Sequence, residues 1–351
     1  MNIRLRSAVQ TLLLTSLAFA RGLQAQTLQT PVLHPSGNMF RPLATPARLV
    51  SDLSELTVVI CLSVFVIVSG LLAFTIIRFG WREGDSRSEP PQVYGSNQVE
   101  IAWTVIPILI VFVLSMSTAR VTAAVQNHTM PKDALYVTVI GHQWWWEFQY
   151  PDYKITTANE LHVPLSTMAQ PKLTSLTLKS ADVSHGFWVP QLAGKTDVIP
   201  NRTNTMWMDP EETGIYLGNC SEYCGTQHAK MEVRVIVDTP EDFDKWVKQQ
   251  QALAAGSDTT QPDANRDAFL ASPCIVCHAV NGTSAMGAIG PDLTHLMSRQ
   301  TLLAAETPNN AANLRDWIKD PQRLKPGNKM PTAQLTDTQL DQIVTYLTTL
   351  K

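Results

Sequence analysis

The sequence lacks two features that would assign it to common classes of protein: a strong net charge and a scattered set of cysteines. The formal net charge of the 351 residues is only −3 at pH 7, which argues against nucleic acid as a partner. Only five cysteines are present, and four of them form the close pairs Cys220/Cys224 and Cys274/Cys277. A disulfide framework would distribute its cysteines more widely. His and Met accompany both pairs, so the pairs indicate metal chemistry instead.

Long apolar runs are missing from the last two thirds of the chain and are concentrated in the first third. Residues 1–25 carry Arg4 and Arg6, then a short apolar run and the sequence Ala-Phe-Ala, which is typical of a secretory signal peptide. An additional membrane helix is the alternative. The runs Leu56–Ile77 and Ile101–Thr118 are each long enough to cross a hydrocarbon core of about 30 Å. We expect them to form a two-helix transmembrane hairpin within residues 45–122.

The loop between the two apolar runs carries Arg78, Arg82 and Arg87. Basic residues in a short loop favour the cytoplasmic side, and the acidic residues beside them contribute little to this rule. The signal peptide predicts the same orientation. The large C-terminal part is therefore expected outside the inner membrane of a bacterial cell. Glu100 stands where the second run begins, either as a solvated interfacial group or as a carboxylate on a proton pathway.

Residues 130–243 alternate short β-rich runs with turns, and they contain no long helical period. Examples are Leu135–Ile140, Leu173–Leu178 and Met231–Val237, which are punctuated by Pro, Gly and Asn. Several short strands separated by turn residues predict a small antiparallel sandwich or barrel.

One loop near the end of this β-rich part gathers soft metal ligands. It contains Cys220, Cys224, His228 and Met231 within twelve residues. Two thiolates, an imidazole and a thioether suit copper better than a hard cation. Zinc would favour a closed set of four Cys and His ligands, where a thioether is unexpected. A further His ligand is needed from upstream, and His185 is the candidate.

A second soluble domain follows a linker. Residues 244–263 are polar and then rich in Gly, Ser, Thr, Asp and Pro, which is a linker composition. Residues 264–351 contain Cys274-Ile-Val-Cys277-His278. This C-x-x-C-H motif is typical of covalent attachment of a c-type haem, with the His as the proximal iron ligand.

The second axial ligand of the haem iron is expected downstream. Met330 is the preferred candidate, because Lys329-Met330-Pro331 resembles the K-M-P segment of class I cytochromes c and Gly290–Leu293 resembles their G-P-x-L turn. The apolar stripe within Asp337–Leu350 predicts a final helix that begins with a capping box of Thr336 and Gln339. Three other side chains compete as the iron ligand: Met286, His295 and Met297.

The two soluble parts differ in charge. Residues 131–245 hold nine basic and fifteen acidic residues, a net of −6, whereas residues 265–351 hold eight and seven, a net of +1. An acidic domain followed by one with a basic edge could dock electrostatically. Two ordinary solvated surfaces are the alternative. The basic edge consists of Arg315, Lys319, Arg323, Lys325 and Lys329.

The ligand-rich loop matches the C-x-E-x-C-G-x-x-H-x-x-M pattern of cytochrome c oxidase subunit II. Asp182-Val-Ser-His185 resembles the D-V-x-H stretch of that family, and Gly141–Trp146 resembles its aromatic G-H-Q-W-x-W segment. With the C-x-x-C-H motif, the chain resembles a subunit II fused to a class I cytochrome c domain, as in caa-type oxidases. The resemblance implies a multi-domain membrane protein with a two-helix hairpin, an all-β cupredoxin-like sandwich or barrel, and an all-α cytochrome c domain.

The resemblance also implies a ligand set for the dinuclear copper A centre. In that family two Cys bridge both copper ions, two His cap one ion each, and a Met and a Glu carbonyl are weak axial ligands. It further implies that Trp144 is the aromatic through which electrons enter, and that the Glu222 carboxylate reaches a magnesium ion shared with subunit I. Carried over to this sequence, the copper ligands are His185, Cys220, Glu222, Cys224, His228 and Met231.

The function implied is that of a subunit of a proton-pumping terminal oxidase. A single haem c would take electrons from cytochrome c or a bc-complex cytochrome and pass them to the copper pair. Oxygen would be reduced in subunit I, because this chain lacks the membrane histidines that an oxygen-binding centre needs. Subunit I, other oxidase subunits and the membrane are thus the expected partners. The alternatives are a copper A-containing subunit of a nitric oxide reductase, and a copper carrier or assembly factor without haem.

Overall fold

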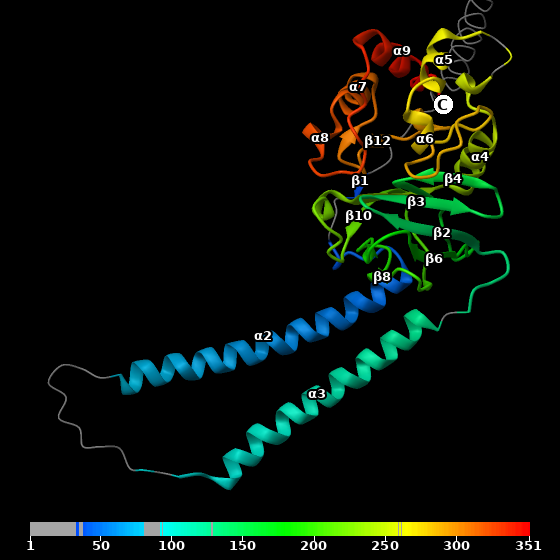
Figure 1. The fold of residues 1–351 in the computed structure, drawn as a ribbon. Coiled ribbons are helices and arrows are strands. Elements are labelled where there is room, and N and C mark those ends of the chain that lie inside the picture. The colour runs from blue at the N-terminus through cyan, green and yellow to red at the C-terminus, as the bar shows by residue number, and fades with distance from the viewer. Residues whose placement is uncertain are drawn as a thin grey trace, which may run out of the picture. The chain divides into compact units, whose positions relative to one another are not determined.

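The computed structural model describes residues 33–34, 38–80, 92, 94–127, 129–258, 260 and 262–351. The expected signal peptide, residues 1–25, lies outside them. The described chain forms two long helices, then a β domain (residues 129–238), then helix α4, and finally a mainly helical C-terminal domain (residues 262–351) (Figure 1). This order of elements confirms the expected fold class.

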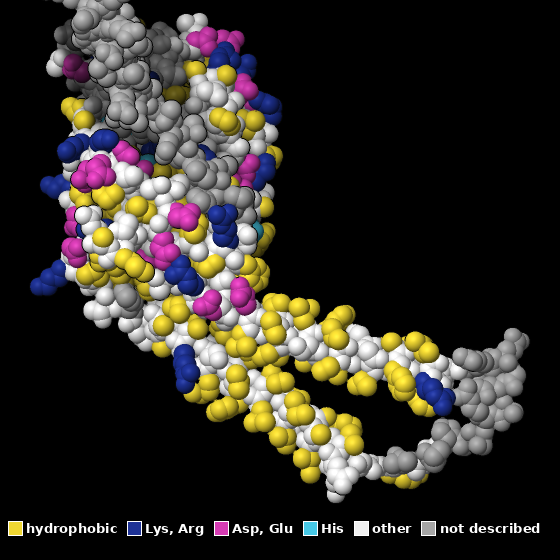
Figure 2. Space-filling model, turned by 180° about the vertical axis from the view of Figure 1, so that it is seen from behind, with side chains coloured by type: hydrophobic (Ala, Val, Ile, Leu, Met, Phe, Trp, Pro, Cys, Tyr) yellow, Lys and Arg dark blue, Asp and Glu magenta, His cyan; other side chains and the backbone are white. Residues whose placement is uncertain are grey.

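Two helices, α2 (Thr45–Phe79) and α3 (Asn97–Gln126), are long and apolar enough to cross a membrane. Their most apolar stretches have mean hydropathies of 2.8 and 2.3, and hydrophobic side chains cover their surfaces (Figure 2). Both helices extend beyond the runs at 56–77 and 101–118 that hydropathy indicates. The extra turns at the start of α2 bury Ala47 and Ser51 against protein, so they need no apolar composition.

Polar contacts attach the helices to the β domain. The backbone N–H and the hydroxyl of Thr45 donate to the Asp209 carboxylate over 2.7 and 2.6 Å. The Trp207 indole N–H donates to the Val125 carbonyl near the end of α3 over 2.8 Å. Leu43 and Ala44 join the hydrophobic core of the β domain. The chain thus enters α2 from the β domain itself.

The β domain contains two sheets. In the first, the strand order is β5-β11-β10-β7-β8, with β1 pairing to β10; in the second it is β4-β3-β2-β6-β9. Side chains alternate along β2, where Leu135, Val137 and Val139 are buried, as expected for a strand with one face on a core. The strands are β1 (Leu33–His34), β2 (Leu135–His142), β3 (Trp145–Tyr150), β4 (Ile155–Ala158), β5 (Glu160–Pro164), β6 (Thr174–Ser180), β7 (His185–Trp188), β8 (Thr196–Val198), β9 (Asn204–Met208), β10 (Gly214–Cys220) and β11 (Glu232–Asp238).

The predicted antiparallel pairing does not hold throughout the β domain. Strand β2 pairs with β6 in parallel, and β11 pairs with β5 in parallel. Parallel neighbours require a crossover between distant strands. Local periodicity identifies each strand but carries no information about its distant partner.

Helix α4 (Pro240–Gln251) occupies the first half of the stretch with linker composition, and the short turn η2 (Ala255–Ser257) follows it. Trp246 stacks on His162 of β5 with ring centroids 4.4 Å apart, which packs α4 on the β domain. At its other end, the Gln250 carbonyl lies 3.1 Å from Nε2 of His295 in the C-terminal domain. This stretch is therefore packed against both domains.

The C-terminal domain surrounds its own hydrophobic core. Its first and last helices pack together, with the rings of Phe269 and Tyr346 5.2 Å apart. The predicted capping box of Thr336 and Gln339 is confirmed at the start of the last helix. The elements are α5 (Ala264–Leu270), α6 (Cys274–Cys277), η3 (Leu296–Ser298), β12 (Thr301–Leu302), β13 (Thr307–Pro308), α7 (Ala311–Lys319), α8 (Pro321–Leu324) and α9 (Asp337–Leu347).

Candidate functional site

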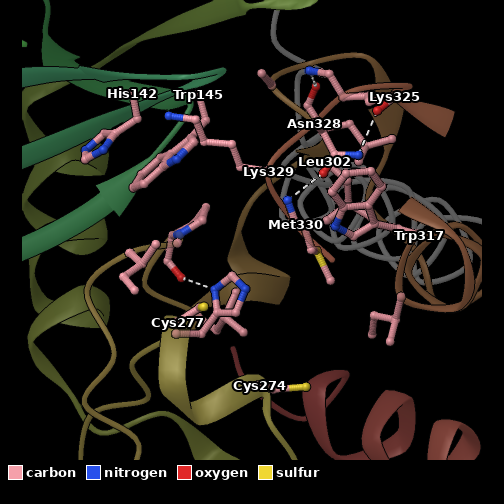
Figure 3. A pocket seen from close by; sticks show the side chains of 18 of the residues that line it. His142, Trp145, Cys274, Cys277, Leu302, Trp317, Lys325, Asn328, Lys329 and Met330 are labelled. Atoms are coloured by element: carbon pink, nitrogen blue, oxygen red, sulfur yellow. Dashed lines mark hydrogen bonds between the residues drawn. The ribbon is translucent and has the colours of Figure 1, made fainter. Parts of the chain in front are cut away.

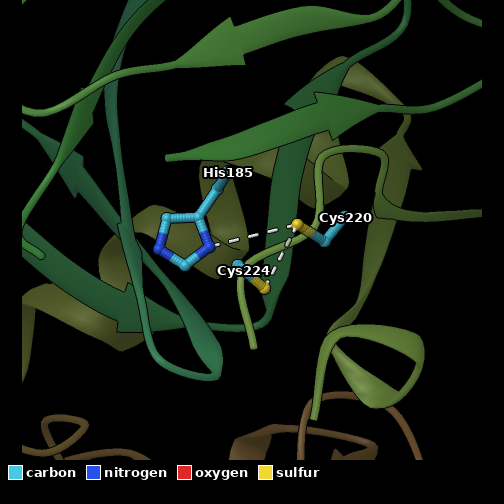
Figure 4. A group of neighbouring side chains, drawn as sticks. All are labelled: His185, Cys220 and Cys224. Carbon is cyan, nitrogen blue, oxygen red and sulfur yellow. Dashed lines mark hydrogen bonds between the residues drawn. The ribbon is translucent and has the colours of Figure 1, made fainter. Parts of the chain in front are cut away.

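Three buried side chains converge at one end of the β domain (Figure 4). His185 begins β7, Cys220 ends β10, and Cys224 lies in the following loop. The two Sγ atoms are 3.7 Å apart, whereas a disulfide bond is about 2.05 Å long. His185 Nδ1 lies 3.9 Å from Cys220 Sγ. The cysteines are therefore free thiols beside an imidazole.

The other three candidate ligands surround the same two sulfur atoms. His228 Nδ1, in the short helix η1 (His228–Lys230), is 3.7 Å from Cys224 Sγ, and Met231 Sδ is 3.9 Å from that sulfur. The Glu222 carbonyl lies 3.2 Å from Cys220 Sγ. One imidazole thus stands beside each thiol, and the donors are mostly soft. This donor set fits copper.

Asp182 fixes the orientation of His185. Its Oδ1 lies 2.9 Å from His185 Nε2, so the ring donates there and presents Nδ1 to the thiols. Burial alone would lower the pKa of His185, but hydrogen bonds with Asp182 and Cys220 outweigh it and raise that pKa. The pKa of Asp182 is held well below its usual range by His185, two backbone N–H groups and Lys329.

The two thiols titrate as a pair. A hydrogen bond from Cys224, assisted by His185, lowers the pKa of Cys220 to about 3. The same bond raises the pKa of Cys224, because its proton is shared with a neighbouring thiolate. One proton therefore leaves readily and the second is retained. Metal ions bind the deprotonated form of both, so metal binding would release the second proton.

The C-terminal domain contains a cavity of about 720 Å³ (Figure 3). Cys274, Cys277 and His278 line it. His278 Nδ1 donates to the Pro291 carbonyl over 2.7 Å, which leaves Nε2 as the acceptor that an iron ligand requires. A Cβ on Gly290 would lie 2.6 Å from His278 Cε1, so only glycine lets the turn approach the ring this closely.

Among the four candidates for the second iron ligand, Met330 alone lines this cavity. Figure 3 shows its side chain directed into the space between Trp317 and Cys277. His295 Nε2 is engaged by the carbonyls of Gln250 and Ala252. The other two methionines are not among the lining residues. The geometry thus favours the sequence-based choice of Met330.

Arg299 also lines the cavity and was not singled out from the sequence. It donates to the Asp292 carbonyl, while its buried Nε has no partner. Among the described residues, no carboxylate forms an ion pair with it. Arg299 is half-buried, and a guanidinium in such a place without a carboxylate partner suits an anionic ligand. The carboxylates of a haem supply that charge, so this cavity fits a haem by charge as well as by its Cys and His residues.

One wall of the cavity belongs to the β domain. Trp144 lines it, and its indole N–H donates to the Cys224 carbonyl over 3.1 Å. Gly225 lies against this indole at φ 117°, where an added Cβ would be 2.9 Å from Trp144 Cζ2. His142, whose role the sequence leaves open, stacks on Trp145 at 4.2 Å in the same wall. The two candidate sites therefore share Trp144 as a neighbour.

The carboxylates of two predicted residues are not part of these sites. Glu100 is in the first turn of α3, and its Oε1 accepts from the Ser96 backbone N–H over 3.3 Å. An acidic group there complements the helix dipole. The Glu222 side chain is exposed, while its carbonyl faces Cys220. Asp182 and Lys329 both lie in motifs found in the sequence, beside His185 and Met330, whereas Arg299 belongs to no local motif.

Family models match nearly the whole described chain. One described as the transmembrane domain of cytochrome c oxidase subunit II matches residues 34–121, and one described as the periplasmic domain of that subunit matches residues 135–238. A cytochrome c model matches residues 265–351.

Individual relatives carry the same family name. A cytochrome c oxidase subunit 2 from Alkalihalophilus pseudofirmus is 32% identical over 88% of this chain and 90% of its own length. A protein of the same name from Bacillus sp. strain PS3 is 34% identical over 78% and 80%. The solved periplasmic domain of subunit II of Bradyrhizobium japonicum cytochrome oxidase is 32% identical, with a TM-score of 0.33, over 35% of this chain and 97% of that domain. The chain is a membrane-anchored member of the cytochrome c oxidase subunit II family that carries a C-terminal cytochrome c domain.

Proposed function

We propose that this chain delivers electrons to the catalytic subunit I of a cytochrome c oxidase, where oxygen is reduced to water and protons are pumped. The electron would arrive at a haem c in the C-terminal domain and pass to a copper A centre in the β domain. Cys274 and Cys277 would hold the haem covalently, with His278 and Met330 on the iron. The copper ions would be held by His185, Cys220, Glu222, Cys224, His228 and Met231.

The position of Trp144 is the observation that carries this proposal. Its ring lines the cavity of the C-terminal domain, and its indole N–H is bonded to the carbonyl of a candidate copper ligand, Cys224. One side chain thus contacts both sites. A route through Trp144 would connect the two sites through one side chain.

When bound, the haem and the copper pair supply one-electron chemistry. The chain's own contribution is to hold those groups in fixed, dry positions. Cys220 and Cys224 are buried, and Asp182 fixes the ring of His185, so little of the site would move when its charge changes. Contacts between the domains keep donor and acceptor at a high effective concentration.

The partners and the orientation in the membrane are part of the proposal. Both soluble domains would lie outside the inner membrane of a bacterium, facing cytochrome c or a bc-complex cytochrome as donor. The exposed carboxylate of Glu222 would reach a magnesium ion shared with subunit I. Glu100, at the start of α3, is the candidate for a proton path. Membranes that consumed nitric oxide but not oxygen would instead support a nitric oxide reductase.

Removing the Trp144 ring tests the proposed route. In the purified oxidase, the haem would be reduced by a light flash while the near-infrared band of the copper centre is followed. Trp144→Leu should slow copper reduction at least tenfold, with one haem and two coppers per chain retained. Trp145→Leu, which alters the neighbouring ring in the same wall, is the matched control and should have a smaller effect. Equal rates in both variants and the wild type would exclude the route.

A further inference from the structure

A carboxylate of the β domain is buried in the contact with the C-terminal domain. Glu160 begins β5 and is only 1% exposed. Its carboxylate accepts from the backbone N–H of Gln300 at 2.9 Å, and from the backbone N–H and hydroxyl of Thr301 at 2.8 and 2.6 Å. All of these donors belong to the other domain. A buried carboxylate is stable only where such donors are held in place.

The residue before this pair of donors is Arg299. Its guanidinium lines the haem cavity, and its Nε is buried without a partner. Glu160 therefore fixes the backbone directly beside Arg299, which forms no ion pair with a carboxylate in the described part of the chain. Burial lowers the pKa of Arg299, and the nearby carboxylates of Asp292 and Glu160 oppose that shift.

The segment that follows is held in an unfavourable conformation. Leu303, Ala304 and Ala305 have φ values of 62°, 58° and 69°, in the left-handed region that non-glycine residues rarely adopt. Such residues persist only where the surrounding structure determines them. Lys325 Nζ donates to the Leu303 carbonyl over 2.9 Å and also to the carbonyl of Lys230 in the β domain over 2.6 Å. Glu160 of the β domain thus holds residues 300–301 directly, and Lys325 connects the Leu303 carbonyl to the β domain.

We propose that Glu160 is a positioning residue for the haem across the domain boundary. By holding Gln300 and Thr301, it keeps Arg299 in place beside the haem carboxylates and so makes the reduction potential of the haem depend on the docked β domain. This inference rests on the proposed function, because it requires a haem in the cavity. Glu160, a residue of the copper-binding domain, would thus influence the haem of the C-terminal domain.

The sign of the change in potential tests the proposal. In the purified oxidase, Glu160→Gln should lower the haem midpoint potential, because the guanidinium of Arg299 moves away from the haem. A threefold change in the haem-to-copper equilibrium is expected, which is about 28 mV at 59 mV per tenfold. Loss of a negative charge acting directly through space would raise the potential. A raised or unchanged potential would therefore overturn the proposal.

Three further variants complete the design. Thr301→Val removes one hydrogen-bond donor to Glu160 with little change of shape, so a smaller fall in the haem midpoint potential is expected. If Glu160→Gln fails to assemble, the potential of Thr301→Val tests the proposal instead. Glu160→Gln should have no further effect in an Arg299→Gln background; a shift of full size there would also overturn the proposal. Glu232→Gln, on the neighbouring strand β11, is the matched control and should leave the potential unchanged.

The two proposals can fail separately. If the wild-type chain binds no haem, or if its reduced haem never reduces the copper, the proposed function fails. If electrons reach the copper normally but the haem potential responds to none of these substitutions, the role of Glu160 alone is refuted.

Discussion

Lys329 of the C-terminal domain and Asp182 of the β domain form an ion pair with Nζ and Oδ2 3.2 Å apart. The other oxygen of the same carboxylate contacts the ring of His185, and Lys329 precedes Met330 in the chain. One carboxylate thus connects a candidate copper ligand to the neighbour of a candidate haem ligand. This pair is also a point at which the basic edge of one domain meets the more acidic domain.

Lys329→Gln should weaken the contact between the two domains while all candidate metal ligands are retained. An ion pair whose lysine is 57% exposed contributes about 0.2–1 kcal/mol, so only a small loss of stability is expected. The rate of electron transfer from haem to copper should fall severalfold and become less sensitive to salt. Flash-induced reduction at low and high ionic strength measures both effects. Lys319→Gln, an exposed lysine on α7 of the same edge, is the control, and an equal fall there would contradict the role of Lys329.

Gly290→Ala should disturb the haem site selectively. The new Cβ would lie 2.6 Å from His278 Cε1 and 2.9 Å from Nδ1, so the ring must rotate or the turn must shift. Loss of the hydrogen bond to the Pro291 carbonyl should weaken iron ligation and increase the high-spin fraction in the optical spectrum. In Gly194→Ala the new Cβ would meet only Val50 at 3.6 Å, so that variant should be spectrally normal. A normal spectrum in Gly290→Ala would contradict the assignment of His278.

The sequence identified the parts of the sites that local chemistry determines. Cys274, Cys277 and His278 must be close in sequence to bind one haem, and the loop from Cys220 to Met231 must be short to surround two ions. Such constraints are visible as motifs. The same reasoning identified strands and helices from their periodicity, because apolar residues recur on the buried face of each element.

The contacts between distant segments could not be predicted in this way. Glu160 and Thr301 are separated by 141 positions, and neither belongs to a motif. The parallel pairing of β2 with β6 likewise depends on chain crossovers rather than on the composition of either strand. The left-handed turn at Leu303–Ala305 contains no glycine, so the usual sequence marker of such a turn is missing.

Thr336→Ala should destabilise the C-terminal domain through its last helix. The Thr336 hydroxyl accepts from the Gln339 backbone N–H, and the Gln339 side chain accepts from that of Thr336. Loss of such a cap costs about 1 kcal/mol. The melting temperature of the haem domain, followed by Soret circular dichroism, should fall. Thr345→Ala, an exposed position within the same helix, is the control and should melt at or above the wild-type temperature; an equal fall in both would contradict the capping effect.

Lys325 should make the stability of the domain contact depend on pH. It is 4% exposed, and burial lowers its pKa from 10.5 to about 8. Below pH 8 the folded protein buries the charged ammonium group of Lys325. Above pH 8 Lys325 loses its proton in the folded protein, whereas the same lysine in the unfolded chain keeps its proton up to about pH 10.5. The free energy of unfolding should therefore rise with pH between about 8 and 10.5 relative to Lys325→Met, by up to about 3 kcal/mol in total. Denaturant titrations of wild type and variant at pH 7.5 and pH 10, followed by the haem signal, measure this difference. The exposed Lys319→Met should show none, and a wild-type advantage over Lys325→Met that is the same at both pH values would refute the effect.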